Sequence, residues 1–153
     1  ASPQKIYNPP VGKMFYEGAT RLYRSSLSIE PVRPTHDLRI AIEVYPALLI
    51  RRYLGRTPYK SDIRAKQTAE KQTARIELLR ALQAKAFYHD YQFQLGLSSE
   101  FRDRLIEDVA GDELDAVLCA IEAAWSWNQR TENLGIPEDV DRNEGWIVSQ
   151  ESQ

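Results

Sequence analysis

Few residues of this chain belong to the types that build disulfides or zinc sites. The 153 residues include one cysteine and two histidines. Cys119 has no second cysteine to pair with, which excludes an intrachain disulfide and fits a reducing compartment. His36 and His89 have no cysteine or histidine at ligand spacing, so zinc is not expected. The cysteine usage therefore predicts a cytoplasmic protein.

Long apolar runs and glycine-rich loops are absent as well. A membrane-spanning helix needs about 18 consecutive apolar residues, and every apolar run here is shorter and interrupted by charge. The opening ASPQKIYNPP lacks the apolar core of a secretory signal. The scattered glycines form no phosphate-binding loop or dinucleotide fingerprint, and no Gly-x-Ser-x-Gly elbow occurs. These absences predict a soluble protein without membrane association, outside the common nucleotide-binding and serine-hydrolase classes.

What is present is the composition of an ordinary globular domain. Hydrophobic residues make up 42% of the chain and charged residues 27%, and the length suffices for one sizeable core. We therefore expect a single domain over residues 1–153. Three prolines within residues 1–13 predict an extended arm there, which leaves residues 14–153 as the folded part.

Apolar periodicity predicts a helix-rich α/β fold with few strands. The clearest strand is LRIAIEVY, residues 38–45, in which apolar positions alternate with small or polar ones. Pro46 ends this strand because it lacks an N–H group, and it suits the first turn of a helix that runs to Gly55. Further helices are predicted over 17–27, over 62–87, from Ser98 or Ser99 to Val109, and from Asp112 to Trp127, with a loop over 28–37 and a closing strand over 144–150.

The charges are unevenly distributed along the chain. Residues 51–85, the basic segment, contain ten lysines and arginines against three acidic residues, whereas residues 86–153 contain four arginines against fifteen acidic residues. Two interpretations are open. The basic segment follows a phosphate backbone, or it is a solvated helix face whose positive charges meet the acidic half across the fold.

Three acidic residues are candidates for chemistry. Glu43 lies within the apolar strand, where a carboxylate either faces water or is costly to bury unless it is paired or metal-bound. Asp112 and Asp115 begin an apolar helix, where acids stabilise the helix dipole and Asp112 can serve as the cap. Capping explains Asp115 less well. Carboxylates from a strand and a packed helix are oxygen ligands of the kind that a two-metal phosphodiesterase uses for Mg²⁺ or Mn²⁺.

Four motifs occur in an order that resembles a known family. They are Glu43-Val44-Tyr45-Pro46-Ala47, Tyr59-Lys60, Asp112 to Ala116, and Glu144 to Ile147. Together they resemble the family called domain of unknown function 429, a family of predicted RNase H-like nucleases. The run PPVGKMFYEGATRL is similar to the family's middle segment.

The resemblance implies an RNase H-like fold in which carboxylates bind Mg²⁺ or Mn²⁺. Glu43 would be the metal ligand from the fourth strand and Asp115 the metal ligand from the last helix. Asp112 would be a further catalytic acid or the helix cap. Lys60 and Arg64 would bind the substrate, with the Lys60 ammonium group on a phosphate.

The chain departs from the family pattern before Glu43, where no counterpart of the first-strand aspartate or of the first three strands occurs. The acids there are Glu17, Glu30 and Asp37, and none lies in a strand-like context. We therefore expect the C-terminal part of an RNase H-like fold, with nuclease activity that is incomplete or absent in this chain. The alternatives are a non-catalytic interaction or scaffold domain, and a nucleic-acid-binding module without cleavage. Open sheet edges predict a homo-oligomer or a missing N-terminal segment in each case.

Overall fold

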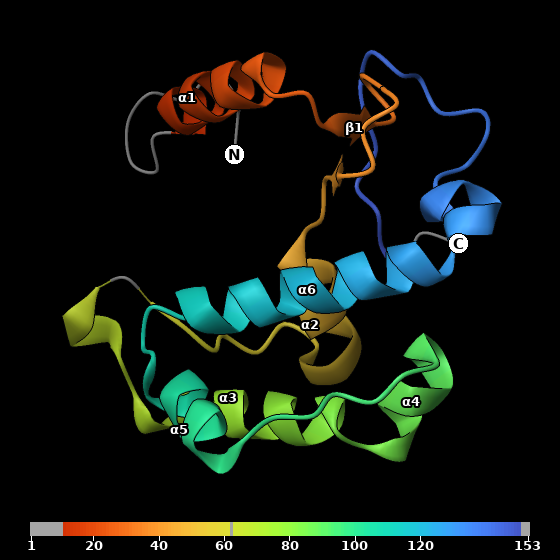
Figure 1. Ribbon diagram of the computed structural model, residues 1–153. Helices are drawn as coiled ribbons and strands as arrows, with labels where there is room; N and C mark the ends of the chain where they lie inside the picture. The colour runs from red at the N-terminus through yellow and green to blue at the C-terminus, as the bar shows by residue number, and fades with distance from the viewer. Residues whose placement is uncertain (1–10, 62, 151–153) are drawn as a thin grey trace. The chain divides into compact units, whose positions relative to one another are not determined.

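The computed structural model describes residues 11–61 and 63–150 and is a helix-rich α/β structure, as predicted (Figure 1). It divides into two compact units. The first comprises the described residues up to Glu43 together with Val140–Trp146, and the second comprises Val44–Asp139 together with the described residues from Ile147 onward. The expectation of a single domain stays a prediction. No helix in the described part of the chain is both long and apolar enough to cross a membrane.

The first unit contains one helix and a small sheet. α1 (Val11–Arg24) begins three residues earlier than the predicted arm ends, so the arm prediction is wrong for residues 11–13. Residues 1–10 of that arm lie outside the described residues. The prolines that suggested an arm stop at position 10, and from there apolar residues repeat along one helix face opposite Lys13, Arg21 and Arg24.

The sheet of the first unit has two parallel strands. β1 (Ser28–Glu30) pairs with β2 (Ile40–Ile42), with Ser28 opposite Ile40. β1 lies inside the segment predicted as a loop, so that prediction is wrong for residues 28–30. The strand was missed because three residues before Pro31 are too few to show a periodic pattern. β2 is shorter than the predicted strand and ends before Glu43. Among the described residues no further strand pairs with these two.

Arg33 fixes the connection between α1 and β1. Its guanidinium group donates hydrogen bonds of 2.6–3.2 Å to four backbone carbonyls, those of Leu22, Tyr23, Ser25 and Leu27. These carbonyls belong to the last turn of the helix, where intrahelical donors run out, and to the residues after it; that of Leu22 also accepts from the N–H of Ser25. One planar side chain therefore satisfies the end of α1 and sets the path into the strand.

The second unit is built from helices. They are α2 (Pro46–Leu54), η1 (Arg64–Lys66), α3 (Ala69–Leu82), α4 (Lys85–Tyr91), α5 (Ser99–Glu107), α6 (Asp112–Asn128) and η2 (Arg130–Gly135). α2 contacts both α3 and α6, and α5 packs on α3 (Figure 1). The predicted starts at Pro46 and Asp112 are confirmed, and the Ser98 hydroxyl caps α5 by accepting a hydrogen bond from the Phe101 N–H.

The apolar stripe of α6 forms the centre of this unit's core. Leu114, Leu118, Ile121 and Trp125 are buried, at the i, i+4, i+7 spacing that the sequence predicts. Burying such side chains stabilises the fold by about 1.5–3 kcal/mol each. Trp127, two residues beyond Trp125, is exposed on the other side of the helix.

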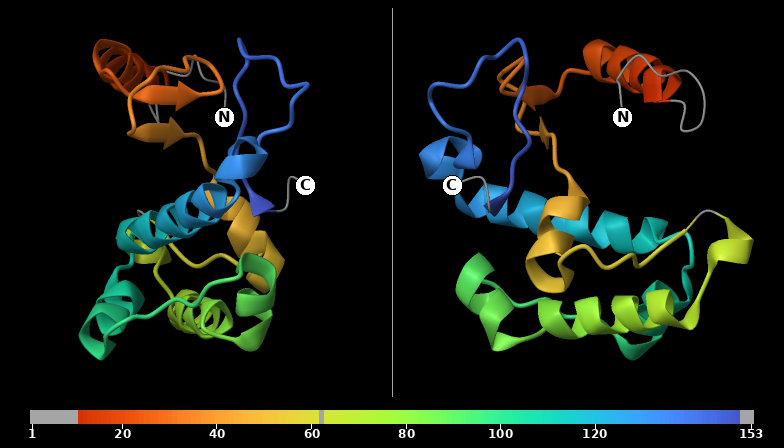
Figure 2. Two further views of the ribbon diagram at one scale, coloured as in Figure 1. Left: turned by 45° about the vertical axis from the view of Figure 1, so that its right-hand side comes forward. Right: turned by 180° about the vertical axis from the view of Figure 1, so that it is seen from behind.

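The prediction of one long helix over 62–87 is wrong, because α3 and α4 are separate helices with different axes (Figure 2). Ala84 is extended, with φ −80° and ψ 162°, although LQAKAF contains only good helix formers and one aromatic residue. After the turn, α4 packs its Phe87 ring against Tyr53 of α2, with ring centroids 6.3 Å apart. Aromatic packing therefore overrides local helix propensity.

The segment 147–150 is anchored on the second unit but does not form the predicted closing strand. Gly145, just before it, has φ +80°, which is incompatible with an extended ladder. Val148 and Ser149 are buried. The Gln150 N–H lies 3.4 Å from Oε2 of Glu122 on α6, and its side-chain oxygen accepts a hydrogen bond from Arg52 on α2. The segment thus joins two helices distant in sequence.

Candidate carboxylate site at the first turn of α6

Asp115 is held by two residues of the loop that follows α2. The Tyr59 hydroxyl donates a hydrogen bond to Oδ1 of Asp115, and Nζ of Lys60 lies 2.5 Å from Oδ2. Both side chains come from the Tyr-Lys motif, and Asp115 comes from the Asp-x-x-Asp motif. The second and third motifs of the sequence therefore meet at one point. The ion pair itself was not predicted, because the sequence reasoning assigned Lys60 to a phosphate.

Gly111 lets the loop approach the helix this closely. Its φ of +74° is left-handed, and a Cβ atom built on it would lie 2.8 Å from Cδ and 2.9 Å from Cβ of Lys60. Such distances do not occur between real side chains, so a larger residue would displace the Lys60 stem. Gly111 falls between the two helices that the sequence predicts to end at Val109 and to begin at Asp112, but its contact with the loop has no sequence signal.

Arg75 on α3 braces the loop from below. It is only 2% exposed; its Nε–H donates to the carbonyl of Ile106 at 2.8 Å, and Nη1 donates to the carbonyl of Tyr59 at 2.7 Å. Burial lowers the pKa of the Arg75 guanidinium, while the Asp108 carboxylate opposes that shift. Arg75 belongs to the basic segment, and neither interpretation of that segment predicted that it is buried. Its position two residues before Glu77 in a polar run gave no signal of burial.

A second set of backbone bonds fixes Ser61 beside the end of α5. The Ser61 N–H donates to the carbonyl of Val109 at 3.3 Å. The Gln67 amide donates to the carbonyls of both Ser61 and Val109. The loop that carries Tyr59 and Lys60 is therefore bonded on both sides, which pre-positions these two side chains.

Burial raises the pKa of the Tyr59 hydroxyl, and the hydrogen bond and charge of Asp115 raise it further. The phenol therefore stays protonated and acts as a permanent donor to Asp115. Each oxygen of the Asp115 carboxylate therefore has one partner, the Tyr59 hydroxyl at Oδ1 and the Lys60 ammonium group at Oδ2. This arrangement orients the carboxylate and places a positive charge beside it.

Asp112 is not the cap of α6, contrary to one of the two roles expected for it. The cap position is Gly111, and Asp112 is the first helical residue, with an exposed side chain. The backbone N–H of Glu113 is instead satisfied by Oδ2 of Asp108, at 2.8 Å. An acid four residues before the first helical residue has taken the capping role, so Asp112 is left available to solvent.

Glu43 directly follows β2, and its side chain is exposed, in agreement with the water-facing interpretation of this residue. Its carboxylate lies near Gly145, since a Cβ atom on that glycine would be 4.0 Å from Oε2. Glu43 belongs to the first unit and Asp115 to the second. The meeting of the two carboxylates on a metal ion stays a prediction. Arg64 lies in η1, and its side chain falls outside the described positions.

The donor set does not by itself fit a two-metal centre. Within residues 11–61 and 63–150, no three His, Cys, Asp or Glu side chains group closely enough to hold an ion. In the second unit Asp112 and Asp115 are the candidates, and the Asp115 charge is already balanced by Lys60. Any metal site at Asp115 therefore needs further carboxylates and a displaced lysine.

Several charges of the basic segment are used inside the protein. Arg75 and Lys60 bind groups of the second unit, and Arg52 forms an ion pair of 2.9 Å with Asp90, a residue of the acidic half. These pairs agree with the interpretation in which positive charges meet the acidic half across the fold. Arg51, Arg56 and Arg80 remain exposed.

Comparison with known proteins places the chain in a family. The model of the family described as Protein of unknown function (DUF429) matches residues 10–142, and the chain belongs to this family. The match includes the first three of the four motifs, while Glu144 to Ile147 lies beyond it. No curated protein and no solved structure matches the chain.

Proposed function

We propose that this chain contributes the strand and helix carboxylates, Glu43 and Asp115, to a metal-dependent phosphodiesterase of the RNase H-like type that acts on nucleic acid. The observation that carries the proposal is the orientation of Asp115, whose Oδ1 accepts a hydrogen bond from Tyr59 while Oδ2 faces a cation, Lys60, that a metal ion would replace. A carboxylate fixed by a permanent donor and a cation is pre-organised, which is what a site of this chemistry requires.

The residues of the chain have distinct roles in this proposal. Tyr59 holds the orientation of Asp115 through Oδ1. Lys60 balances the charge of Asp115 and is placed to bind a phosphate oxygen of the substrate when Asp115 takes another partner. Arg75 keeps the loop in place. Because Asp112 and Asp115 alone do not fit a two-metal centre, the proposal needs Glu43 as a further ligand for the first metal ion, and a second metal ion would need one more acid, from a second copy or another segment.

Calorimetric titration of Mn²⁺ into the chain tests the proposal. We expect saturable binding by the wild type that is lost in Glu43→Gln and in Asp115→Asn. Glu77→Gln, which removes an exposed acid on α3, is the matched control and should bind as the wild type does. Equal binding by all four proteins, or none by any, would contradict a metal site at these carboxylates.

A second candidate function is a non-catalytic interaction domain, and the first unit favours it. A parallel sheet of two three-residue strands is below the size at which sheets are independently stable. On α1, Met14 and Phe15 are each 66% exposed and Tyr23 is 76% exposed, so this apolar face has little cover. Both features are typical of a unit completed by another chain or segment.

Sedimentation equilibrium over a range of protein concentrations tests this second candidate. We expect the wild type to self-associate and the Phe15→Ser, Tyr23→Ser double variant to be shifted toward the monomer. Tyr88→Ser, which changes an exposed tyrosine of the second unit, should leave the equilibrium unchanged. A monomeric wild type at every concentration would remove the self-association form of this candidate.

A further inference from the structure

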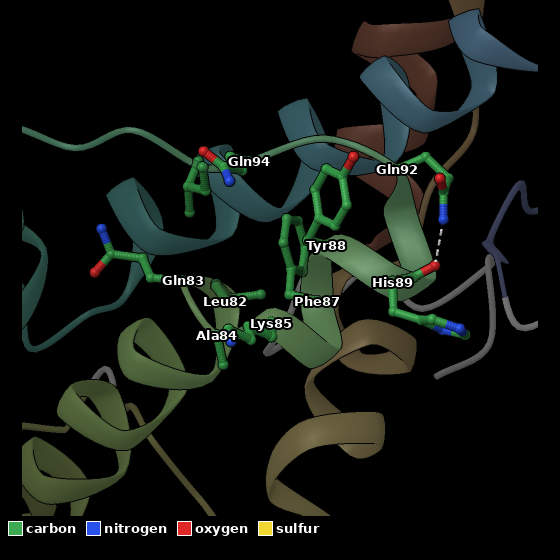
Figure 3. Close-up of a pocket in the computed structure, with 10 residues that line it drawn as sticks. Leu82, Gln83, Ala84, Lys85, Phe87, Tyr88, His89, Gln92 and Gln94 are labelled. Carbon is green, nitrogen blue, oxygen red and sulfur yellow. Dashed lines mark hydrogen bonds between the residues drawn. The ribbon is translucent and has the colours of Figure 1, made fainter.

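A groove of about 800 Å³ lies in the second unit, away from the Asp115 site (Figure 3). Its walls come from the end of α3, from α4, and from the segment 92–95 that follows. The lining combines apolar rings with side-chain amides. Its volume falls within the range of small-molecule and nucleotide sites.

The floor of the groove is fixed by aromatic packing. Phe87 is stacked on Tyr91 at 4.7 Å, and Phe93 meets Phe87 edge-on at 5.6 Å. Between them Gln92 adopts a left-handed conformation with φ +60°, which is uncommon for a residue other than glycine. This turn brings residues 93–95 back over α4. The groove is therefore built into the fold and does not depend on a ligand to form.

Amide groups surround the opening of the groove. The side chains of Gln83 and Gln94 are exposed and make no hydrogen bond to any described residue. The Gln92 amide donates to the carbonyl of His89 at 2.7 Å, which keeps its side chain at the rim. A glutamine amide offers a donor and an acceptor side by side, and this pair matches the edge of a nucleobase.

Tyr88 supplies an aromatic surface between these amides. Its side chain is 49% exposed, and Figure 3 shows the ring raised from α4 toward the segment that bears Gln94. Exposed aromatic rings stack on bases with little dependence on sequence. Lys85, exposed at the start of α4, is a cation at the same rim. An aromatic face, free amides and one cation together match the ring, the edge and the phosphate of a nucleotide.

We infer that this groove binds a nucleobase, with Tyr88 stacking on the ring, Gln83 and Gln94 bonding to its edge, and Lys85 contacting the attached phosphate. The choice of a single-stranded polynucleotide as the source of that base rests on the proposed function. A base must be unpaired to enter, so the groove selects single-stranded over duplex substrate. Binding at the groove needs neither a metal ion nor Asp115.

Fluorescence anisotropy with labelled oligonucleotides in EDTA tests the inference. The probes are single-stranded DNA and RNA of equal length, the same DNA as a duplex, and an abasic strand that keeps the phosphates alone. We expect the base-bearing single strands to bind more tightly than the duplex and the abasic strand. Tyr88→Leu should weaken their binding about 10-fold, because a stacked base contributes roughly 1–3 kcal/mol. Gln94→Leu should weaken it to a smaller extent.

Controls separate the groove from the rest of the surface. Tyr23→Leu removes an exposed tyrosine of α1 and should bind as the wild type does. Since Tyr88 is half exposed, Tyr88→Leu should also keep the thermal unfolding of the wild type. In a competition experiment, adenosine monophosphate would displace the labelled oligonucleotide. An equal Kd for the two would support base recognition and identify a free nucleotide as the ligand.

The inference is overturned if the abasic strand binds as tightly as the base-bearing strands, or if Tyr88→Leu binds as the wild type does. The first result would mean that only phosphates are recognised, and the second that any base recognition takes place away from Tyr88. Failure of the phosphodiesterase proposal is a different observation, namely the absence of Mn²⁺ binding at Asp115, and it leaves oligonucleotide binding in EDTA unchanged.

Discussion

The Nζ atom of Lys60 lies 2.5 Å from Oδ2 of Asp115, although 55 positions separate the two residues in the chain. The two side chains are 34% and 27% exposed, so water screens the pair. An ion pair of this kind stabilises a fold by about 0–1 kcal/mol. Its value at this position is therefore in placing a cation beside a carboxylate more than in holding the fold together.

Replacing Lys60 with methionine should separate these two roles. We expect the free energy of unfolding, measured by urea denaturation, to fall by less than about 1 kcal/mol. Under the proposed function, the affinity for Mn²⁺ should rise, because the Asp115 oxygen is no longer shared with an ammonium group. Lys66→Met is the control, since Lys66 is exposed on η1. Weaker Mn²⁺ binding in Lys60→Met alone would argue against competition between the two cations.

Gly111→Ala should destabilise the second unit by about 1–3 kcal/mol, because φ is +74° and the new Cβ would overlap the Lys60 stem. Urea denaturation measures the effect. Gly18→Ala provides the opposite control: Gly18 lies within α1 with no atom within 4 Å of its added Cβ. That substitution should stabilise by roughly 0.5–1 kcal/mol through helix propensity. Equal effects of the two substitutions would refute the close approach.

Arg75→Met should cost roughly 2–4 kcal/mol, because the carbonyls of Tyr59 and Ile106 would lose buried donors. Arg75→Lys should recover only part of this loss, since an ammonium group cannot reproduce the two-armed geometry of guanidinium. Arg80→Met changes an exposed arginine on the same helix and should have little effect. The midpoints of thermal unfolding of the three variants check this ranking. A midpoint in Arg75→Met equal to that of the wild type would show that Arg75 does not hold the loop in place.

Alkaline pH should weaken the second unit. Burial raises the pKa values of Tyr53, Tyr59 and Tyr91 above the ordinary 10.0. Below pH 10 both states are protonated and this contribution to stability is fully present. As the pH rises through the folded pKa values, the unfolded chain releases protons first, so the free energy of unfolding falls.

The substitution Tyr59→Phe should make that decline above pH 10 less steep, because one of the three contributions is removed. Urea denaturation at a series of pH values measures the slope. Tyr23→Phe changes an exposed tyrosine of the first unit and should leave the slope unchanged. An unaltered slope in Tyr59→Phe would show that this phenol is not buried as the structure places it.

Local signals predicted the starts of α2, α5 and α6, but not those of α1 and α3, which were expected at residues 17 and 62. Pro46 requires an extended residue before it, and Tyr45 has φ −129° and ψ 98°, so the strand-to-helix change could be derived from the sequence. Ser98 and Gly111 likewise marked the beginnings of α5 and α6 through their chemistry. These features depend on a few neighbouring residues, and for that reason they are visible in the sequence.

Features made by distant residues could not be predicted in the same way. The separation of α3 from α4 at Ala84 accompanies the packing of Phe87 against Tyr53 of α2, which outweighs strong local helix propensity. The burial of Arg75 depends on two carbonyls that belong to other segments. Neither the apolar periodicity nor any motif of the sequence indicates such contacts.

The candidate site was predicted in part. The motifs indicated that Lys60 and Asp115 belong to one site, and the structure brings them together. Their mutual neutralisation, and the role of Tyr59 as donor, follow only from side-chain geometry. Asp108 took the capping role expected of Asp112, because its side chain accepts a hydrogen bond from the N–H of Glu113, five residues later in the chain. The left-handed turn at Gly111 makes this contact possible.

The hydrogen bond between Arg52 and Gln150 joins residues 98 positions apart, and Val148 beside it is fully buried. During synthesis, α2 through α6 emerge from the ribosome before this partner segment exists. The nascent helices can pair locally, but the hydrogen bonds that Gln150 makes with α2 and α6 can form only after residues 147–150 are synthesised. The second unit can therefore finish folding only after almost the whole chain has been synthesised. Until then the apolar surface that Val148 covers is exposed, and exposed apolar surface is what chaperones bind.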